Sequence, residues 1–386
     1  MSSAPSTAGR FHAFDSLRAA MMLLGIVFHT AYGYITLPFG WVYKDSSTTP
    51  VADVLAMGIH TFRMPLFFVM AGFFTALLAD RRGMNLMLRN RLARVTLPLV
   101  LAWIVIIPAT HAATMFANWR LSGERNLSEL VVYLAHGDYW RNNTRHLWFL
   151  WYLTIFYLAV WLIAPLVRRA SRRVRAMLSA GFVRVMGHPL RALVLALPMA
   201  VVLWFEGGVL RNSSSFTPGV LLPSGYALFF GFGWALWHHQ ELLETLPQFA
   251  WTQVMLGLLL LPVNLAALGH LDAGVGPHLV ATVTGAMIAS LMIFGLSGIA
   301  VRYAGHERPV TRYLTDASYW MYLLHLPLIL IVMGFLSRTP LSATVKILVV
   351  LGIVTPLLLG SYHYLVRDTP IGTLLNGRRY PRRRPK

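Results

Sequence analysis

The sequence contains no cysteine and few acidic residues. Among 386 residues, Asp and Glu together number 14. The absence of cysteine excludes disulfides, thiolate metal sites and a cysteine nucleophile. The few acidic residues of the apolar segments lie near the segment ends, so we expect no carboxylate pair for glycosidase-like chemistry and no metal site of His and carboxylate ligands. The chain also lacks a phosphate loop and a dinucleotide-binding fingerprint.

Charge of any kind is scarce, and apolar residues are abundant. Charged residues make up 12% of the chain, hydrophobic residues 56%, and the mean hydropathy is +0.59. Several apolar runs reach the roughly 20 residues that cross a bilayer. We therefore predict one all-α, polytopic membrane domain over residues 1–386, with about ten transmembrane helices around a polar cavity. The expected spans are residues 14–36, 54–79, 93–117, 146–167, 190–206, 219–237, 250–268, 278–300, 314–336 and 343–366.

The 33 Lys and Arg residues are concentrated in alternate connections. This distribution follows the positive-inside rule, so we expect no nucleic-acid partner and place both termini in the cytoplasm. The first apolar run is expected to be an uncleaved span. The basic tail, residues 378–386, is predicted to bind anionic lipid. In the outer connection 118–145, the spacing of apolar residues predicts a short interfacial helix around residues 127–134.

The first span carries two ionisable side chains, Arg18 and His29. They are eleven residues apart, so they return to within about 20° of one helix face and lie about 16 Å apart along the axis. Ionisable groups at such depth usually face a bundle interior or a water-filled cavity. The alternative is a snorkelling Arg18 and a His29 that hydrogen-bonds to a neighbouring helix.

The second span contains His60 and Arg63, which share a helix face, followed by Pro65. The proline should kink or break the helix in mid-membrane, which is tolerated only where the helix lines protein or a cavity. Arg63 lies about nine residues from the non-cytoplasmic face, too deep for easy snorkelling. A functional or internally paired role is therefore predicted for Arg63.

The ninth span carries a polar stripe of Ser318, Tyr322 and His325 at helical spacing. His325 is expected at nearly the same depth as His29 and Arg63. Convergence of three ionisable groups at one level predicts either a site or a structural polar network that is costly to bury.

Arginines also open the third span, where Arg89, Arg91 and Arg94 are expected at the cytoplasmic mouth. In one interpretation these arginines only fix the orientation of the chain in the membrane. In the other they form, with Arg18, a basic funnel for a phosphorylated donor, because the guanidinium binds phosphate through two hydrogen bonds.

Six segments resemble the membrane acyltransferase type 3 superfamily in order and spacing, and within it the glucan biosynthesis protein C group. They are FDSLRAAMMLLGIVFH, HTFRMPLFFVMAGFF, RNRLARVTLPL, RHLWFL, SYWMYLLHLPL and YHYLVRDTPIGTLLNG. The resemblance extends from about Phe11 to Gly377. It implies a ten-span enzyme that transfers an acyl group, here succinyl, from cytoplasmic acyl-CoA to osmoregulated periplasmic glucans.

Under this resemblance the donor is a substrate, and no permanently bound cofactor or metal is expected. His29 would be the general base, while Arg63 and His325 would stabilise the oxyanion or bind the succinyl carboxylate. Membrane lipids are expected as further partners. A homo-oligomer is compatible with the sequence but is not predicted by it. Residues expected to bind donor or acceptor are Asp15, Arg18, His60, Arg89, Arg94, Arg145, His146, Trp148, Ser318 and Tyr322.

Two alternatives remain. One is an O-acetyltransferase that acts on another envelope polysaccharide. The other is a secondary transporter, although many transporters contain sequence repeats and this chain shows none. Consumption of an acyl-CoA donor distinguishes an enzyme from a transporter.

Overall fold

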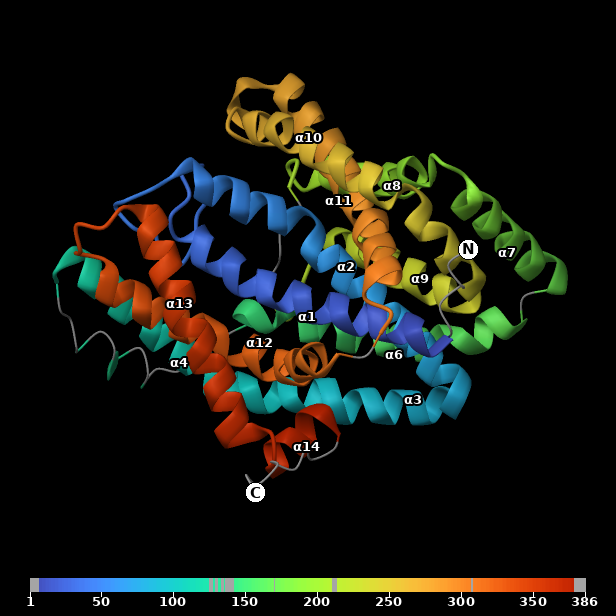
Figure 1. Cartoon of the computed structure of the whole chain (residues 1–386), viewed down its shortest axis with the longest axis horizontal. Coiled ribbons are helices and arrows are strands. Elements are labelled where there is room, and N and C mark those ends of the chain that lie inside the picture. The colour runs from blue at the N-terminus through green and yellow to red at the C-terminus, as the bar shows by residue number, and fades with distance from the viewer. Residues whose placement is uncertain are drawn as a thin grey trace.

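The protein is all-helical (Figure 1). The computed structural model describes residues 7–377, except 125–127, 129–130, 133–134, 136–141, 170, 210–213 and 307. No β-strand occurs within these ranges, which confirms the predicted fold class. The interfacial helix predicted around residues 127–134 falls largely outside the described residues, and the basic tail 378–386 falls wholly outside them.

Each of the ten predicted spans coincides with a helix. By length and composition, eight helical stretches of the described residues are suited to crossing a membrane, or nine if the bent α7–α8 pair is one crossing. The chain is therefore a multi-pass membrane protein. The helices on the predicted spans are α1 (Thr7–Tyr32), α2 (Pro50–Arg82), α4 (Leu97–Ser122), α6 (Trp148–Arg169), α8 (Arg191–Phe205), α9 (Leu221–His238), α10 (Ala250–Leu268), α11 (Val275–Tyr303), α12 (Pro309–Leu336) and α13 (Ala343–Ser361).

Shorter elements connect or extend these helices. The π-helical turn η1 joins α3 to α4 in one continuous stretch, and a second π-helical turn, η6, extends α13. The 3₁₀ turns are η3 (Arg145–Leu147), η4 (Gln240–Phe249) and η5 (Leu271–Ala273), and the remaining short elements are α3 (Met84–Arg91), η1 (Leu92–Thr96), α7 (Arg172–Gly187), η6 (Tyr362–Val366) and α14 (Pro370–Asn376).

Helix α7 lies where the sequence pattern indicated only a basic connection. Ser171 caps it, because the Ser171 hydroxyl accepts the Val174 N–H at 3.3 Å. Its exposed apolar side chains include Met177 and Leu178, and arginines occupy the same helix. The helix meets α8 at 111°. A search for long apolar runs misses such a helix because its charged residues interrupt the run.

Helix α2 is the buried centre of the bundle and contacts α1, α9 and α11. It runs unbroken through Pro65, so of the predicted kink or break, the break is wrong. Pro65 and the three residues before it are buried within the protein, where an α-helix tolerates a proline. Close packing with α9 depends on Gly72 and Gly233, because a Cβ at either position would meet the Phe230 or Val69 carbonyl oxygen.

Elements far apart in sequence meet at one end of the bundle, which we call the arginine end. Thr315 of α12 donates a hydrogen bond to the Asp15 carbonyl at 3.0 Å, and Asn376 of α14 donates to the Asp316 carbonyl at 2.9 Å. The Tyr319 hydroxyl donates to the Arg94 carbonyl at 3.1 Å. The loop between α1 and α2, residues 33–49, lies at the opposite end of these helices.

Candidate functional site

A cavity of about 690 Å³ opens at the arginine end. It lies among α1, α2, the end of α3, η1, α6, α12 and α14. Two aspartates, Asp15 and Asp316, are the acidic residues among its described lining, so positive charge is in excess. The arginines that line it are Arg18, Arg91, Arg94, Arg308 and Arg312.

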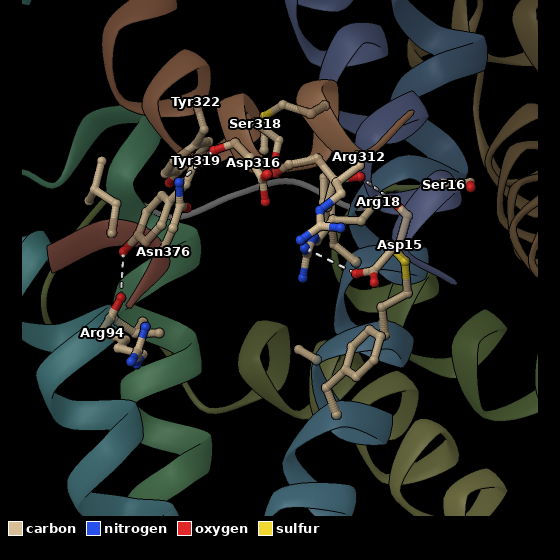
Figure 2. Close-up of a pocket in the computed structure, with 18 of the residues that line it drawn as sticks. Asp15, Ser16, Arg18, Arg94, Arg312, Asp316, Ser318, Tyr319, Tyr322 and Asn376 are labelled. Carbon is tan, nitrogen blue, oxygen red and sulfur yellow. Dashed lines mark hydrogen bonds and ion pairs between the residues drawn. The ribbon is translucent and has the colours of Figure 1, made fainter. Parts of the chain in front are cut away.

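The arginines approach the cavity from more than one side (Figure 2). Arg18 of α1 and Arg312 of α12 lie close together, and Arg94 lies across from them. Arg18 also pairs with Asp15, with 3.1 Å between Nη2 and Oδ1, and both side chains are about two-fifths exposed. Water therefore screens this pair, and it contributes little to stability.

The inner part of the cavity is mainly apolar. Met22, Phe67, Met70 and Phe149 line it, and Ser318 adds a hydroxyl. That hydroxyl donates to the Thr315 carbonyl at 2.6 Å within its own helix. A cavity with a charged entrance and an apolar inner part suits a ligand that has a polyanionic head and a flexible, less polar arm.

Beyond the cavity lie His29, His146 and His325, which we call the histidine cluster. The ring centroids of His29 and His325 are 5.0 Å apart, and those of His146 and His325 are 5.3 Å apart. The predicted convergence of His29 and His325 is thus confirmed. His146, expected at the outer interface, joins them. His29 is partly exposed, whereas His146 and His325 are buried.

Backbone contacts indicate which ring nitrogen carries the proton in two of these histidines. The Nδ1 of His325 lies 2.7 Å from the Tyr322 carbonyl and 3.2 Å from the Met321 carbonyl. A carbonyl only accepts, so Nδ1 is the donor and Nε2 of the neutral ring has a free lone pair. By the same reasoning His146 donates through Nε2 to the Leu323 carbonyl at 3.1 Å. Within the described residues, neither His325 Nε2 nor His29 Nδ1 has a hydrogen-bond partner.

Arg63 adds a buried cation beside the cluster. Its Cζ lies 5.0 Å from the centroid of the Phe28 ring, a cation–π arrangement. The guanidinium also packs against Gly25 of α1, where a side chain would collide with it. Its Nε has no hydrogen-bond partner in the described part of the chain. His60 stacks on Phe28 with 5.3 Å between centroids.

The cavity and the histidine cluster are adjacent but separate. None of the described residues lining the cavity belongs to the cluster or is Arg63. Tyr322 links the two, because its ring lines the cavity and its hydroxyl donates to the His146 carbonyl at 2.6 Å. The Phe149 ring contacts both Tyr322 and Phe67, which also line the cavity. We call Tyr322, Phe149 and Phe67 the aromatic layer.

Three other predicted residues lie elsewhere. Arg89 is exposed on α3 and is not part of the cavity lining as described. Arg145 contacts His111, with 3.1 Å between Nη2 and Nδ1. Trp148 is buried against Tyr226, with 5.2 Å between ring centroids. These positions favour structural roles for Arg145 and Trp148.

Sequence reasoning missed several cavity residues, among them Arg308, Arg312, Tyr319 and Asn376. A signal existed for part of this set. The polar stripe of α12 continues from Ser318 through Thr315 to Thr311, and Arg312 is the next residue after Thr311. Asn376 gave no signal, because only the folded chain brings α14 to the cavity.

The described residues form no metal centre. No group of three or more His, Asp or Glu side chains among the described residues is arranged to hold a metal ion. The cavity chemistry instead suits an anionic organic ligand.

The chain is similar to curated proteins named glucans biosynthesis protein C. Those of Salmonella paratyphi B and Salmonella enteritidis are each 32% identical to it over 156 residues. The aligned region spans 40% of this chain and 38% of each relative. No solved structure matches the chain.

A broader similarity covers most of the sequence. Residues 11–363 match the family described as an acyltransferase domain. This range includes the histidine cluster, Arg63 and every cavity arginine named above. The chain therefore belongs to this acyltransferase family, as a multi-pass membrane member of it.

Proposed function

We propose that the protein is an O-succinyltransferase of the bacterial inner membrane. Succinyl-CoA enters the cavity from the cytoplasm, and the acceptor is a hydroxyl of a periplasmic glucan that reaches the histidine cluster from the opposite end. Both termini are then cytoplasmic. The observation that carries the proposal is the arginine-lined cavity that ends one aromatic layer short of the histidine cluster. The name shared by the similar Salmonella proteins supports a glucan acceptor.

The cavity suits coenzyme A in charge and in size. Its volume of about 690 Å³ lies within the range of about 300–1,000 Å³ usual for small-molecule sites. Five arginines face it, and their planar guanidinium groups bind phosphate through paired hydrogen bonds. The phosphates of the donor bind at this end, and its flexible arm extends along the apolar depth.

The thioester must pass the aromatic layer to react. Met22 lines the cavity, and His29 lies seven residues farther along α1, about 10 Å at 1.5 Å per residue. Displacement of the Tyr322 and Phe149 rings opens the path. We infer that donor binding drives this movement and that the layer is closed when no donor is bound.

In the reaction, His29 takes the proton of the glucan hydroxyl as its oxygen attacks the thioester carbonyl. The tetrahedral intermediate collapses to the ester, and the coenzyme A thiolate leaves and takes up the proton. The free lone pair on His325 Nε2 is suited to accept a hydrogen bond from the His29 imidazolium. In this tautomer the one N–H of His325 is bonded to backbone carbonyls, so Arg63 stabilises the oxyanion or binds the succinyl carboxylate.

Replacing the proposed base tests the chemistry. We expect His29→Ala to lower acyl transfer by about 10² to 10⁴, the usual contribution of a general base, while donor affinity stays near that of the parent. Transfer is measured with purified protein, succinyl-CoA and glucan. His278→Ala is the matched control, because that ring bonds to the Trp204 carbonyl away from the cluster. Unchanged glucan acylation by His29→Ala would eliminate His29 as the base.

Replacing a cavity arginine tests donor binding. We expect Arg312→Gln to raise the KM for succinyl-CoA roughly ten-fold with little change in kcat, because it removes a charge-assisted contact to phosphate. The difference should shrink at high salt. Arg338→Gln is the control, because Arg338 is exposed near Gly123 at the opposite end. Equal donor KM values in the two variants would contradict the cavity assignment.

Replacing Arg63 tests whether this residue recognises the succinyl group of the donor. We expect Arg63→Ala to lower turnover of succinyl-CoA more than that of acetyl-CoA, because acetyl has no second carboxylate for the guanidinium to bind. Arg191→Ala controls for structural damage, since Arg191 is also buried over an aromatic ring, with its Cζ 5.2 Å from the Phe294 centroid. An equal loss with both donors would rule out recognition of the succinyl carboxylate by Arg63.

A further inference from the structure

The loop of residues 33–49 is fixed in place by two carboxylates. Asp53 of α2 accepts the backbone N–H groups of Thr36 and Leu37 at 2.9 and 3.1 Å, and it also accepts the Thr36 hydroxyl. Farther along the loop, the Asp45 carboxylate accepts the Tyr43 hydroxyl at 2.8 Å. Asp53 therefore holds the start of the loop, and Asp45 lies toward the end of the loop.

Asp45 also forms an ion pair that the sequence did not indicate. Lys346 of α13 donates to the Asp45 carboxylate at 2.9 Å and to the Ser337 carbonyl at 3.2 Å. The two charged side chains are 1% and 0% exposed. A pair buried this fully is costly unless its hydrogen bonds are satisfied, and losing one partner is strongly destabilising. The Lys346–Asp45 pair therefore fixes one position of the loop relative to α13.

The residue that this loop brings to the histidine cluster is Trp41. Its indole lies over the His29 ring, with 6.2 Å between centroids and 23° between planes. Tyr32 meets the indole edge-on at 5.6 Å. The indole can lie this close because Gly33 has no side chain, and a Cβ there would be 3.2 Å from Trp41 Cζ3. Both Trp41 and Tyr32 are partly exposed.

We propose that Trp41, with Tyr32 beside it, binds a pyranose ring of the acceptor next to His29, and that the Lys346–Asp45 pair positions Trp41. Pyranose rings present C–H faces that stack on aromatic rings, while their hydroxyls face polar groups. An indole fixed before binding loses little conformational entropy when the sugar binds. This inference rests on the proposed function, because it places the acceptor on the side of His29 opposite the arginine cavity.

A binding measurement tests Trp41 without requiring turnover. The probe is a short unsubstituted gluco-oligosaccharide, titrated against the purified full chain in the absence of donor. We expect Trp41→Ala to weaken binding about ten-fold or more, Trp41→Phe to restore most of it, and coenzyme A affinity to be equal in both, which reports an intact fold. Trp251→Ala is the matched control, because Trp251 is 51% exposed on α10.

Kinetics separate this inference from the proposed function. In the transfer assay, Trp41→Ala should raise the KM for glucan and leave the KM for succinyl-CoA unchanged. The double variant Asp45→Asn with Lys346→Met removes both buried charges together, and it should also raise only the glucan KM. If the parent acylates glucan and Trp41→Ala changes neither oligosaccharide binding nor glucan KM, the inference is overturned alone. If the parent consumes no donor, the proposed function fails instead.

Discussion

The structure depends on keeping a guanidinium inside a bundle of apolar helices. Arg63 is buried, and no carboxylate pairs with it in the described part of the chain. A charge in this position is expensive, and an aromatic ring face supplies only part of the compensation. Helix α1 accommodates this charge in two ways. Gly25 leaves room for the guanidinium, and the face of the Phe28 ring packs against it. A substrate that brings negative charge to Arg63 would supply the missing partner.

The two ends of the bundle have different chemistry. At one end, arginines gather around a cavity formed by helices from both halves of the chain. At the other, the Trp41 ring of the 33–49 loop lies over His29, and the buried Lys346–Asp45 pair anchors the loop. The histidine cluster lies between them. On the proposed assignment, a phosphorylated donor and a neutral sugar therefore reach one set of imidazoles from opposite compartments without sharing an entrance.

Much of this organisation could be predicted from sequence because it follows from local patterns. Hydropathy located ten helices, and eight or nine helical stretches of the described residues are suited to crossing a membrane. Helical spacing and expected depth predicted that His29 and His325 lie close together. Long-range contacts could not be predicted in this way. Lys346 and Asp45 are 301 positions apart, and no periodicity pairs them. The unbroken course of α2 through Pro65 likewise depends on helices packed around it, which a proline rule applied to one helix does not include.

The most direct measurement places the two substrates in separate compartments. The protein is reconstituted in sealed vesicles with the arginine end facing outward, unlabelled glucan is enclosed, and labelled succinyl-CoA is added only outside. The account predicts labelled glucan inside the vesicles and free coenzyme A outside, with neither formed when the donor is omitted or the protein is inserted in the reverse orientation. Labelling that occurs only when donor and glucan share a compartment would contradict it.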